Sequence, residues 1–514
     1  MSGDATVAIT AAWATGAGDT STPARYALSR WLFLRLVGVV YLIAFLSLAP
    51  QVPGLVGAHG ILPAGAFLDQ AHALYGSAAY RLFPTLCWFG AGDGMLRVLC
   101  WGGALLALLL IAGVGQAPVL LCLWVVYLSV SVVGQTFLWF QWDGLLLETG
   151  LLAVFYAPTT LRPGLTREPA PPTLGRWLVW WLLFRLMFLS GITKLVSGDP
   201  TWRHLTALDY HFWTQPLPPW TAWYVQQAPE WLRRGMTLAV LGIELLVPWL
   251  IFVPERWRRA RYAACGLLVL GQLGIAASGN YGFFNLLALV LCISLVDDRV
   301  LERVLPLRAG VRPPEPRWAE YVTRGVAPLF ALLSLLACAH EIAQTIPGAR
   351  GALDNPLLRA VAPLRSVNGY GLFRVMTTER PEIVIEGSAD SVQWREYGFR
   401  WKPGDLDRRP AFVAPHMPRL DWQMWFAALD PAGARDWLVP LLEHLLRGTP
   451  EVVALLGHNR FPERPPRYVR LAYYHYRFAT PAERAGTGAW WERQLLGYLT
   501  PALSLGRAPS LREP

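Results

Sequence analysis

Residues 95–115, MLRVLCWGGALLALLLIAGVG, and residues 117–134, APVLLCLWVVYLSVSVVG, decide the fold class of this chain. Arg97 is the single charged side chain within the two stretches. A helix needs about 20 mostly apolar residues to cross the hydrocarbon core of a bilayer, and both stretches come close to that length. They therefore predict two consecutive membrane spans.

Comparable apolar stretches recur through the first two-thirds of the chain. Hydrophobic residues make up 54% of the sequence and charged residues 16%, whereas soluble domains carry about 25% charged residues. The further candidate spans are residues 31–49, 143–158, 177–196, 235–253, 262–278, 281–297 and 326–346. The predicted fold is a polytopic α-helical membrane protein of about nine spans with a C-terminal extracytoplasmic α+β domain.

The predicted domain organisation follows from where composition changes. Residues 25–346 form the membrane domain, and residues 347–504 form a C-terminal domain that contains a small β-sheet or sandwich. The ends, residues 1–24 and 505–514, are expected to be disordered. Residues 1–24 also lack the basic and apolar regions of a cleavable signal peptide, so the first span is expected to act as the insertion signal.

The arginines between the spans predict the orientation of the chain. If the N-terminus is cytoplasmic and the spans alternate, the cytoplasmic segments hold most of the arginines, as the positive-inside rule requires. An odd number of spans then places the C-terminal domain outside, in the periplasm or cell exterior. These cytoplasmic residues are Arg25, Arg30, Arg162, Arg167, Arg176, Arg256, Arg258, Arg259, Arg261, Arg299, Arg303, Arg308, Arg312, Arg317 and Arg324.

Two outer loops, residues 50–94 and 197–234, are too long to be simple turns, and the second is rich in aromatic side chains. Such residues favour the lipid headgroup layer, but exposed aromatic surface also suits a partly folded client protein. An aromatic helix that begins near Asp421, the expected N-cap, offers a second surface of this kind, with packing in its own core as the alternative. The client-binding candidates are Trp202, Tyr210, Trp213, Phe373, Trp422, Met424, Trp425 and Phe426.

The C-terminal domain combines alternating and helical patterns. Residues 382–386, 394–401 and 468–478 are expected to be strands, and residues 435–446 and 451–456 helices. All six cysteines lie in or beside apolar segments before this domain. No clustered metal ligands, hydrolase motif or phosphate-binding loop is apparent, so neither a metal nor a cofactor is expected. The net charge of +10 is explained by the loop arginines, and no nucleic-acid module is present.

Ionisable side chains within predicted spans are costly to bury and are candidates for function. Glu148, Arg185 and Glu244 lie deep enough that we expect them to pair across helices. Lys194 lies at the outer end of a span. It either fixes the depth of the helix or, if desolvated, serves as a general base.

Several strings resemble the lipase maturation factor family. They are GQTFLWFQWDGLLLETG (134–150), FRLMFLSGITKLVSGDPTWRHLTALDYHFWTQPLP (184–218), NYGFFNLL (280–287), NGYGLFRVMTTERPEIVIEGS (368–388), PRLDWQMWFAAL (418–429) and RYVRLAYYHYRF (467–478). In animals the resemblance implies a protein of the endoplasmic reticulum that helps secreted lipases fold into active dimers, with a luminal C-terminal domain that contacts the client. The implied partners are therefore membrane lipid and a secreted protein such as a lipase, and the implied role is a folding factor rather than an enzyme.

The composition, rich in Ala, Arg, Pro and Trp but poor in Lys, resembles that of high-GC bacteria, in which the periplasm or cell exterior replaces the lumen. A weaker resemblance gives the alternative. SGITKL followed by DPTW is similar to the part of vitamin K-dependent gamma-carboxylase that contains its catalytic lysine. On that hypothesis Lys194 is the general base of a membrane-embedded enzyme, assisted by Asp199, His204 and His211.

Overall fold

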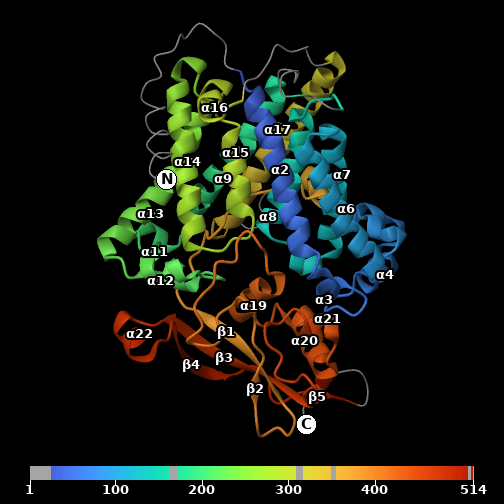
Figure 1. The fold of residues 1–514 in the computed structure, drawn as a ribbon, viewed down its shortest axis with the longest axis vertical. Helices are drawn as coiled ribbons and strands as arrows, with labels where there is room; N and C mark the ends of the chain where they lie inside the picture. The colour runs from blue at the N-terminus through green and yellow to red at the C-terminus, as the bar shows by residue number, and fades with distance from the viewer. Residues whose placement is uncertain are drawn as a thin grey trace.

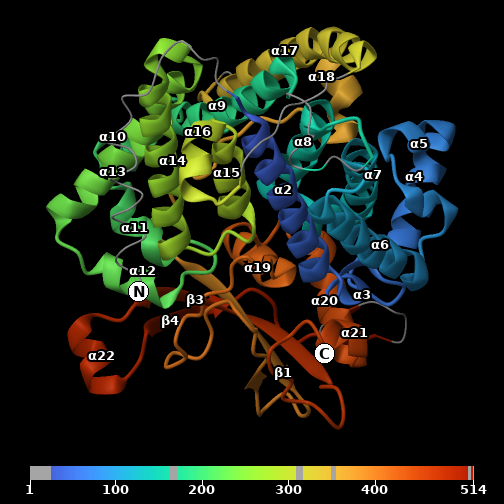
Figure 2. The same cartoon turned by 45° about the horizontal axis from the view of Figure 1, so that its top comes forward.

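The computed structural model describes residues 25–161, 164, 171–307, 316–348, 355–506 and 511–512. Long helices form a bundle at one end of the molecule, and a smaller domain of strands and helices covers the other end (Figure 1). The tilted view keeps the same separation, with the sheet below the helices (Figure 2). One continuous hydrophobic core runs from the bundle into the C-terminal domain.

Seven helical segments within the described residues are long and apolar enough to cross a membrane. They are α2 (Ala27–Leu48), α6 (Asp93–Ala112), α7 (Gln116–Val133), α9 (Thr173–Val196), α13 with η5 (Glu230–Leu245, Val247–Phe252), η6 with α14 (Glu255–Trp257, Arg258–Ser278) and α17 (Arg317–Thr345). The other two expected spans coincide with α8 (Gln141–Tyr156) and α15 (Phe284–Ile293), which are short for a crossing. The helical membrane domain is confirmed, and the number of nine crossings stays a prediction.

The turn between α6 and α7 explains how two apolar helices can follow each other so closely. Gly113 ends α6 with φ of 79°, and Gly115 precedes α7 with φ of 52°. Both values lie in the left-handed region that a residue without Cβ adopts at little cost. Two glycines therefore reverse the chain within three residues.

The arginine-bearing segments meet at the end of the bundle away from the C-terminal domain. Arg261 donates a hydrogen bond of 2.6 Å to the hydroxyl of Tyr26, and Tyr26 donates one of 3.3 Å to Glu255. Asp298, the first residue of α16 (Asp298–Val304), accepts the backbone N–H of Leu28 at 2.8 Å. Segments that the charge pattern assigns to the same side of the membrane thus share one face, which bears α16 in Figure 1.

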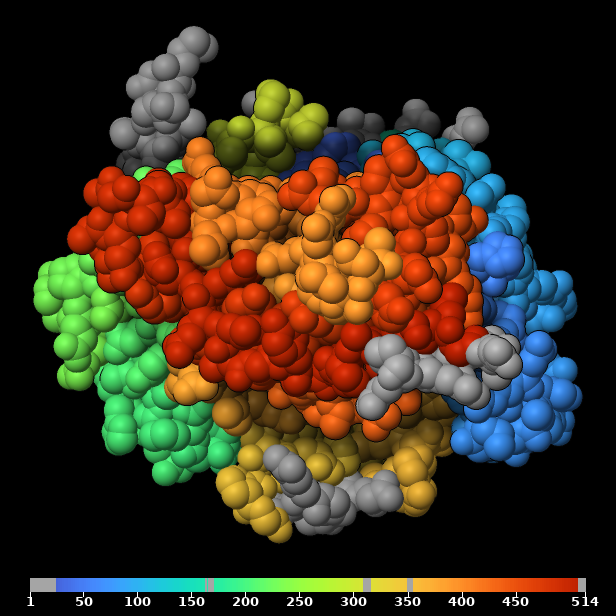
Figure 3. Space-filling view, turned by 90° about the horizontal axis from the view of Figure 1, so that it is seen from below, coloured from blue at the N-terminus to red at the C-terminus, as the bar shows by residue number. Residues whose placement is uncertain are grey.

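The two long outer loops are folded and lie at the opposite end. Residues 50–94 form α3 (Val52–Val56), α4 (Ala64–Tyr75), η1 (Gly76–Ala78), α5 (Ala79–Leu82) and η2 (Leu86–Phe89). Residues 197–234 form α10 (Pro200–Arg203), α11 (Ala207–Thr214), α12 (Trp220–Gln226) and the start of α13. Seen from below, these two segments, blue and green, flank the C-terminal domain on either side (Figure 3).

The C-terminal domain is built on a four-stranded antiparallel sheet in the order β2-β1-β3-β4. The strands are β1 (Pro381–Ser388), β2 (Arg395–Glu396), β3 (Tyr468–Phe478) and β4 (Trp491–Tyr498), and β5 (Ser504–Leu505) pairs with β6 (Leu511–Arg512). The helices of this domain are α19 (Arg419–Leu429), α20 (Arg435–Arg447), α21 (Pro450–Val453) and α22 (Pro481–Thr487). The short elements α18 (Pro356–Val361) and η7 (Ala362–Leu364) precede the sheet, and α18 lies beside α17 (Figure 2), while η3 (Gln135–Leu138) connects α7 to α8 in the bundle. The expected small sheet in an α+β domain is confirmed.

The expected strands and the two ends of the chain differ in how far the structure bears on them. The strands expected over 382–386 and 468–478 are present, but of the strand expected over 394–401 only residues 395–396 form a strand beside β1, and Gly398 makes an isolated bridge with His458. Residues 1–24, expected to be disordered, lie outside the described residues, as do 507–510 and 513–514 of the C-terminal tail. Within that tail, Leu505 and Leu511 are partners in the β5–β6 pair.

Candidate functional site

The junction between the bundle and the C-terminal domain contains a buried ion pair between Asp143 and Arg419. Arg419, in the first turn of α19, places its two terminal nitrogens 2.5 and 2.8 Å from the two carboxylate oxygens of Asp143, in the first turn of α8. The hydroxyl of Tyr127 donates to the same carboxylate at 2.6 Å. Burial alone lowers the pKa of Arg419, but Asp143 outweighs it and raises that pKa. A bidentate pair of this kind fixes the position of the C-terminal domain relative to the bundle.

A second buried pair, between Glu148 of α8 and Arg185 of α9, also binds the start of the C-terminal domain. Glu148 accepts the backbone N–H of Asn368 at 3.1 Å and the hydroxyl of Tyr370 at 2.8 Å. Arg185 donates to the carbonyl of Asn368 at 3.1 Å. The pairing across helices expected for these two residues is therefore completed by the NGYG segment, residues 368–371, a contact that sequence spacing did not suggest.

Glu244, the third intramembrane candidate, pairs with Lys194. The Lys194 ammonium lies 2.7 and 2.9 Å from the two carboxylate oxygens of Glu244 and donates to the carbonyl of Ser190 at 3.0 Å. The ring of Trp202 lies 5.2 Å from the same nitrogen. A general base needs a free lone pair, whereas Lys194 uses its protons as a donor.

The four residues of the enzyme hypothesis are not gathered into one catalytic group. Lys194 and His211 line the same cavity. Asp199 caps α10 by accepting the backbone N–H of Thr201 at 2.7 Å, and its other oxygen accepts the backbone N–H of Met376 at 2.6 Å. His204 ends α10 and is exposed. Asp199 thus ties the linker of the C-terminal domain to the bundle.

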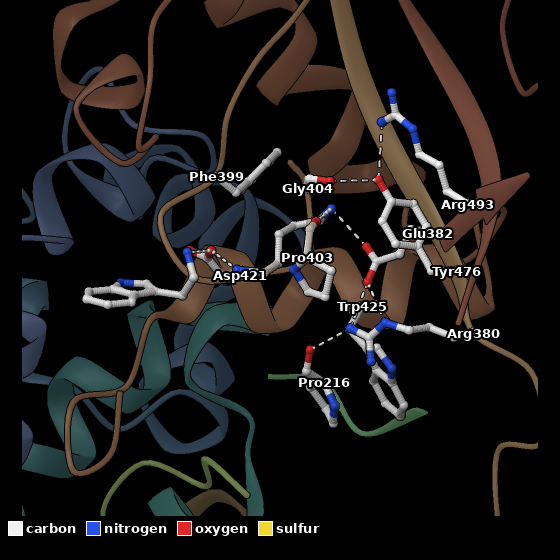
Figure 4. Close-up of polar contacts among 12 residues, drawn as sticks. Pro216, Arg380, Glu382, Phe399, Pro403, Gly404, Asp421, Trp425, Tyr476 and Arg493 are labelled. Atoms are coloured by element: carbon white, nitrogen blue, oxygen red, sulfur yellow. Dashed lines mark hydrogen bonds and ion pairs between the residues drawn. The ribbon is translucent and has the colours of Figure 1, made fainter. Parts of the chain in front are cut away.

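The side chain of Arg380, which immediately precedes β1, hydrogen-bonds to backbone carbonyls of the outer loop 197–234 (Figure 4). It donates to the carbonyls of Trp213 and Pro216, each at 2.8 Å, and to that of Gln215. Its Nε and Nη2 also lie 3.0 and 2.7 Å from one oxygen of Glu382. Burial lowers the pKa of Arg380, and the Glu382 carboxylate opposes that shift. The fork of five donors suits this arrangement of three carbonyls and a carboxylate.

Most of the aromatic client-binding candidates are covered by the chain itself. Trp202 donates to the carbonyl of Phe373 at 2.9 Å and is buried. Trp422 packs edge-on against Trp142 of α8, with ring centroids 4.7 Å apart. Trp425 donates to the carbonyl of Thr214 at 2.9 Å.

Exposure separates the remaining candidates. Met424 is buried, Tyr210, Trp213 and Phe373 are half-buried, and Phe426 is 44% exposed. Client contact by these residues stays a prediction, but in this structure the buried ones hold the two domains together.

The expected N-cap role of Asp421 is wrong. Pro418 stands at the N-cap of α19, and Asp421 lies inside the first turn. Its carboxylate accepts the backbone N–H groups of Trp401 and Lys402 at 2.8 and 2.9 Å. Burial raises the pKa of Asp421, and these two donors oppose the shift. Asp421 therefore anchors the 401–402 loop to α19 rather than capping the helix.

Comparison with known proteins identifies a family domain on each side of the junction. Residues 28–303 match the family model described as the lipase maturation factor transmembrane domain, and residues 366–501 match the one described as the lipase maturation factor C-terminal domain. The chain belongs to the lipase maturation factor family. In this member of the family, Asp143 lies within the first matched region and Arg419 within the second, so their ion pair joins the two family domains.

The relatives cover most of the chain. Lipase maturation factor 2 of Homo sapiens is 37% identical over 598 aligned positions, which cover 93% of this chain and 83% of the relative. That of Gallus gallus is 35% identical over 588 positions, with coverage of 93% and 81%. Lipase maturation factor 1 of Homo sapiens is 34% identical over 532 positions, with coverage of 96% and 91%. No solved structure matches, and neither the family models nor these relatives support the carboxylase-like alternative.

Proposed function

We propose that this chain is a membrane-embedded maturation factor that assists the folding or assembly of a secreted protein, a lipase by the names of its relatives. The observation that carries the proposal is the buried junction, in which Asp143–Arg419 and Glu148–Asn368 fix the C-terminal domain against the bundle. A domain held in this way stays at the bilayer surface, where a client emerges before its own apolar surface is covered.

The proposed orientation has the N-terminus in the cytoplasm and the C-terminal domain in the periplasm or cell exterior. It is supported by the arginine-rich segments lying on the face opposite to that domain, as the positive-inside rule requires. About nine crossings result if α8 and α15 count as short spans. An even number would bring the C-terminal domain to the cytoplasmic side.

Two matched cysteines test the orientation. Val392 of the C-terminal domain is 78% exposed, and Val304 at the end of α16 is 52% exposed. With the exposed native Cys122 replaced by alanine, an impermeant thiol reagent added to intact cells should label the Val392→Cys protein, and the Val304→Cys protein only after lysis. In a bacterial host the outer membrane is first made permeable. The reverse pattern would refute the proposed orientation.

For the client surface we propose the free edge of β4. This strand ends the sheet, and within the described residues no strand pairs with its outer edge. Leu495, Leu496 and Tyr498 are exposed there, and the register shift in β3–β4 leaves Leu496 as an extra residue. Unpaired backbone groups beside apolar side chains can accept an extended segment of another chain.

A reporter lipase tests both the function and the surface. Cells lacking the native factor secrete a dimeric lipase, and its activity per unit of secreted protein is measured with and without this chain. Leu496→Lys places a charge on a residue that is 55% exposed, and Val392→Lys does so at 78% exposure in the loop between β1 and β2 of the same domain. We expect the first to reduce specific activity severalfold and the second to leave it unchanged at equal membrane levels. No gain of specific activity with the unmodified chain would refute the proposed function for that lipase, and an unaffected Leu496→Lys protein would refute only the surface.

A further inference from the structure

A cavity of about 380 Å³ lies between α9, α13 and α14, on the side of the bundle that carries α11. Its wall is mainly apolar and includes Leu186, Ile243, Leu270 and Phe284. Leu270 also belongs to the exposed apolar surface of α14 that faces the lipid in a membrane. A hydrocarbon chain from the bilayer can therefore reach the cavity without crossing water. The volume lies within the range of small-molecule sites, about 300–1,000 Å³.

The polar end of the cavity has a defined direction of hydrogen bonding. Gln215 donates through Nε2 to the carbonyls of Phe212 and Ser278 at 3.2 and 2.7 Å, so its Oε1 is an acceptor. The hydroxyl of Tyr281 donates to that oxygen at 2.8 Å. Because its single proton is used there, the Tyr281 oxygen accepts the 3.0 Å hydrogen bond from Nε2 of His211.

The second nitrogen of His211 is then an acceptor. Burial lowers the pKa of this imidazole to about 4, so the ring is neutral near pH 7 and carries one N–H. That N–H is on Nε2, which leaves a lone pair on Nδ1. Within the described residues Nδ1 makes no hydrogen bond, and His211 lines the cavity beside Phe373. An acceptor without a partner at the end of an apolar cavity calls for a donor on the ligand.

The other ionisable groups of the cavity do not call for a charged ligand. Lys194 and Glu244 lie 2.7 Å apart and neutralise each other. An anionic head group would face the lone pair of His211 and the Glu244 carboxylate, and a cationic one would face Lys194. An uncharged head group avoids both costs.

From this geometry we propose that the cavity binds an uncharged lipid with one hydrocarbon chain and a free hydroxyl, whose proton is donated to Nδ1 of His211. The chain lies between α13 and α14, and the head group meets the polar end formed by His211 and the Lys194–Glu244 pair. The cavity does not include the two buried ion pairs of the junction or the β4 edge, but Trp202 and Phe373, which join the linker to the bundle, line its wall. The proposal does not depend on the client.

The test uses the full-length purified protein in nanodiscs and a photoactivatable probe, tetradecan-1-ol with a diazirine in its chain. Labelling of peptides from α13 and α14 should saturate and should be displaced by tetradecan-1-ol. The methyl ether of the same chain lacks only the proton and should compete about five- to tenfold less well, the size of one neutral hydrogen bond. Tetradecanoate at pH 7.5 should also compete less well. Equal competition by the ether, or stronger competition by tetradecanoate, would overturn the proposal.

Two substitutions locate the site. Gly271 lines the cavity, where an added Cβ would lie 3.4 Å from Ile243, and Gly266 on the same helix has open space around it. Gly271→Leu should abolish the saturable labelling, and Gly266→Leu should not. Both replace a helical glycine, so loss of fold affects them alike. His211→Phe should retain labelling but remove the preference for the alcohol over the ether. Unchanged labelling of Gly271→Leu or an unchanged preference in His211→Phe would contradict the assignment.

Discussion

Removing the guanidinium of Arg419 should separate the two domains. Arg419→Met keeps an unbranched apolar stem but removes the guanidinium, which leaves the Asp143 carboxylate, at 2% side-chain exposure, without its partner. Breaking a buried ion pair in this way costs about 3–5 kcal/mol of stability. The loss should appear in the C-terminal domain first, because Arg419 begins α19, which packs on β1.

The measurement is a double-mutant cycle with Asp143→Asn, followed by pulse proteolysis of the purified protein across a guanidinium series. Asp143→Asn alone should cost a similar amount, because it leaves the arginine buried with a neutral partner. The double variant should lose much less than the sum, with a coupling free energy of about 3 kcal/mol or more, because neither charge remains. An exposed pair provides the control: Arg477→Met next to Glu483 should leave the unfolding midpoint unchanged. Additive effects in the cycle, or a stable Arg419→Met protein, would refute the role given to this ion pair.

Three further outcomes are expected. The pKa of His211 is about 4 in the folded protein and about 6.5 in the unfolded chain, so the unfolded chain takes up the proton first as pH falls. The free energy of unfolding should therefore drop by roughly 3 kcal/mol between pH 6.5 and 4. The thermal midpoint of His211→Phe should depend less on pH over that range, and equal slopes in the two proteins would contradict this. Gly54→Ala would bring a Cβ to 2.2 Å from a backbone oxygen of α21 and should cost about 1–3 kcal/mol in denaturant unfolding, whereas Gly65→Ala, with 3.9 Å of clearance, should cost nothing. Arg380→Lys replaces five donors on three nitrogens by three on one, so it cannot bind the three carbonyls and Glu382 together. It should raise amide hydrogen exchange over residues 213–217 about tenfold or more, and an unchanged exchange rate would contradict this.

The sequence was sufficient wherever a local pattern determines structure. Apolar length located the membrane helices, alternation located β1, and enrichment in aromatic residues located β3, because each of these signals lies within one segment. The strand expected over 394–401 is short because Gly398 pairs with His458 instead of with β1. β4 was missed because Trp491–Tyr498 mixes polar and apolar residues without a regular period.

The junction could not be predicted because its partners are far apart in the sequence. Asp143 and Arg419 are separated by 276 positions, and Glu148 and Asn368 by 220. Each of these residues lies in a string that carries the family resemblance, but a single sequence does not indicate which string meets which. The choice between a client surface and core packing for Trp422 has the same limit: its chemistry suits both, and only the fold shows that Trp142 of α8 packs against it.

The same contacts determine how the client hypothesis can be tested. Deleting residues 363–514 would remove the C-terminal domain, but it would also remove Arg419 and Asn368, leaving the carboxylate of Asp143 without its ion-pair partner and that of Glu148 without part of its hydrogen bonding. Lost maturation after such a deletion would follow from a damaged bundle as readily as from a missing client surface. Lys194→Ala has the same weakness, because it leaves the carboxylate of Glu244 without its ion-pair partner and can damage the bundle for that reason alone. A charge placed on the free edge of β4 disturbs none of these contacts, so among these variants it is the one whose loss of function reports on the client.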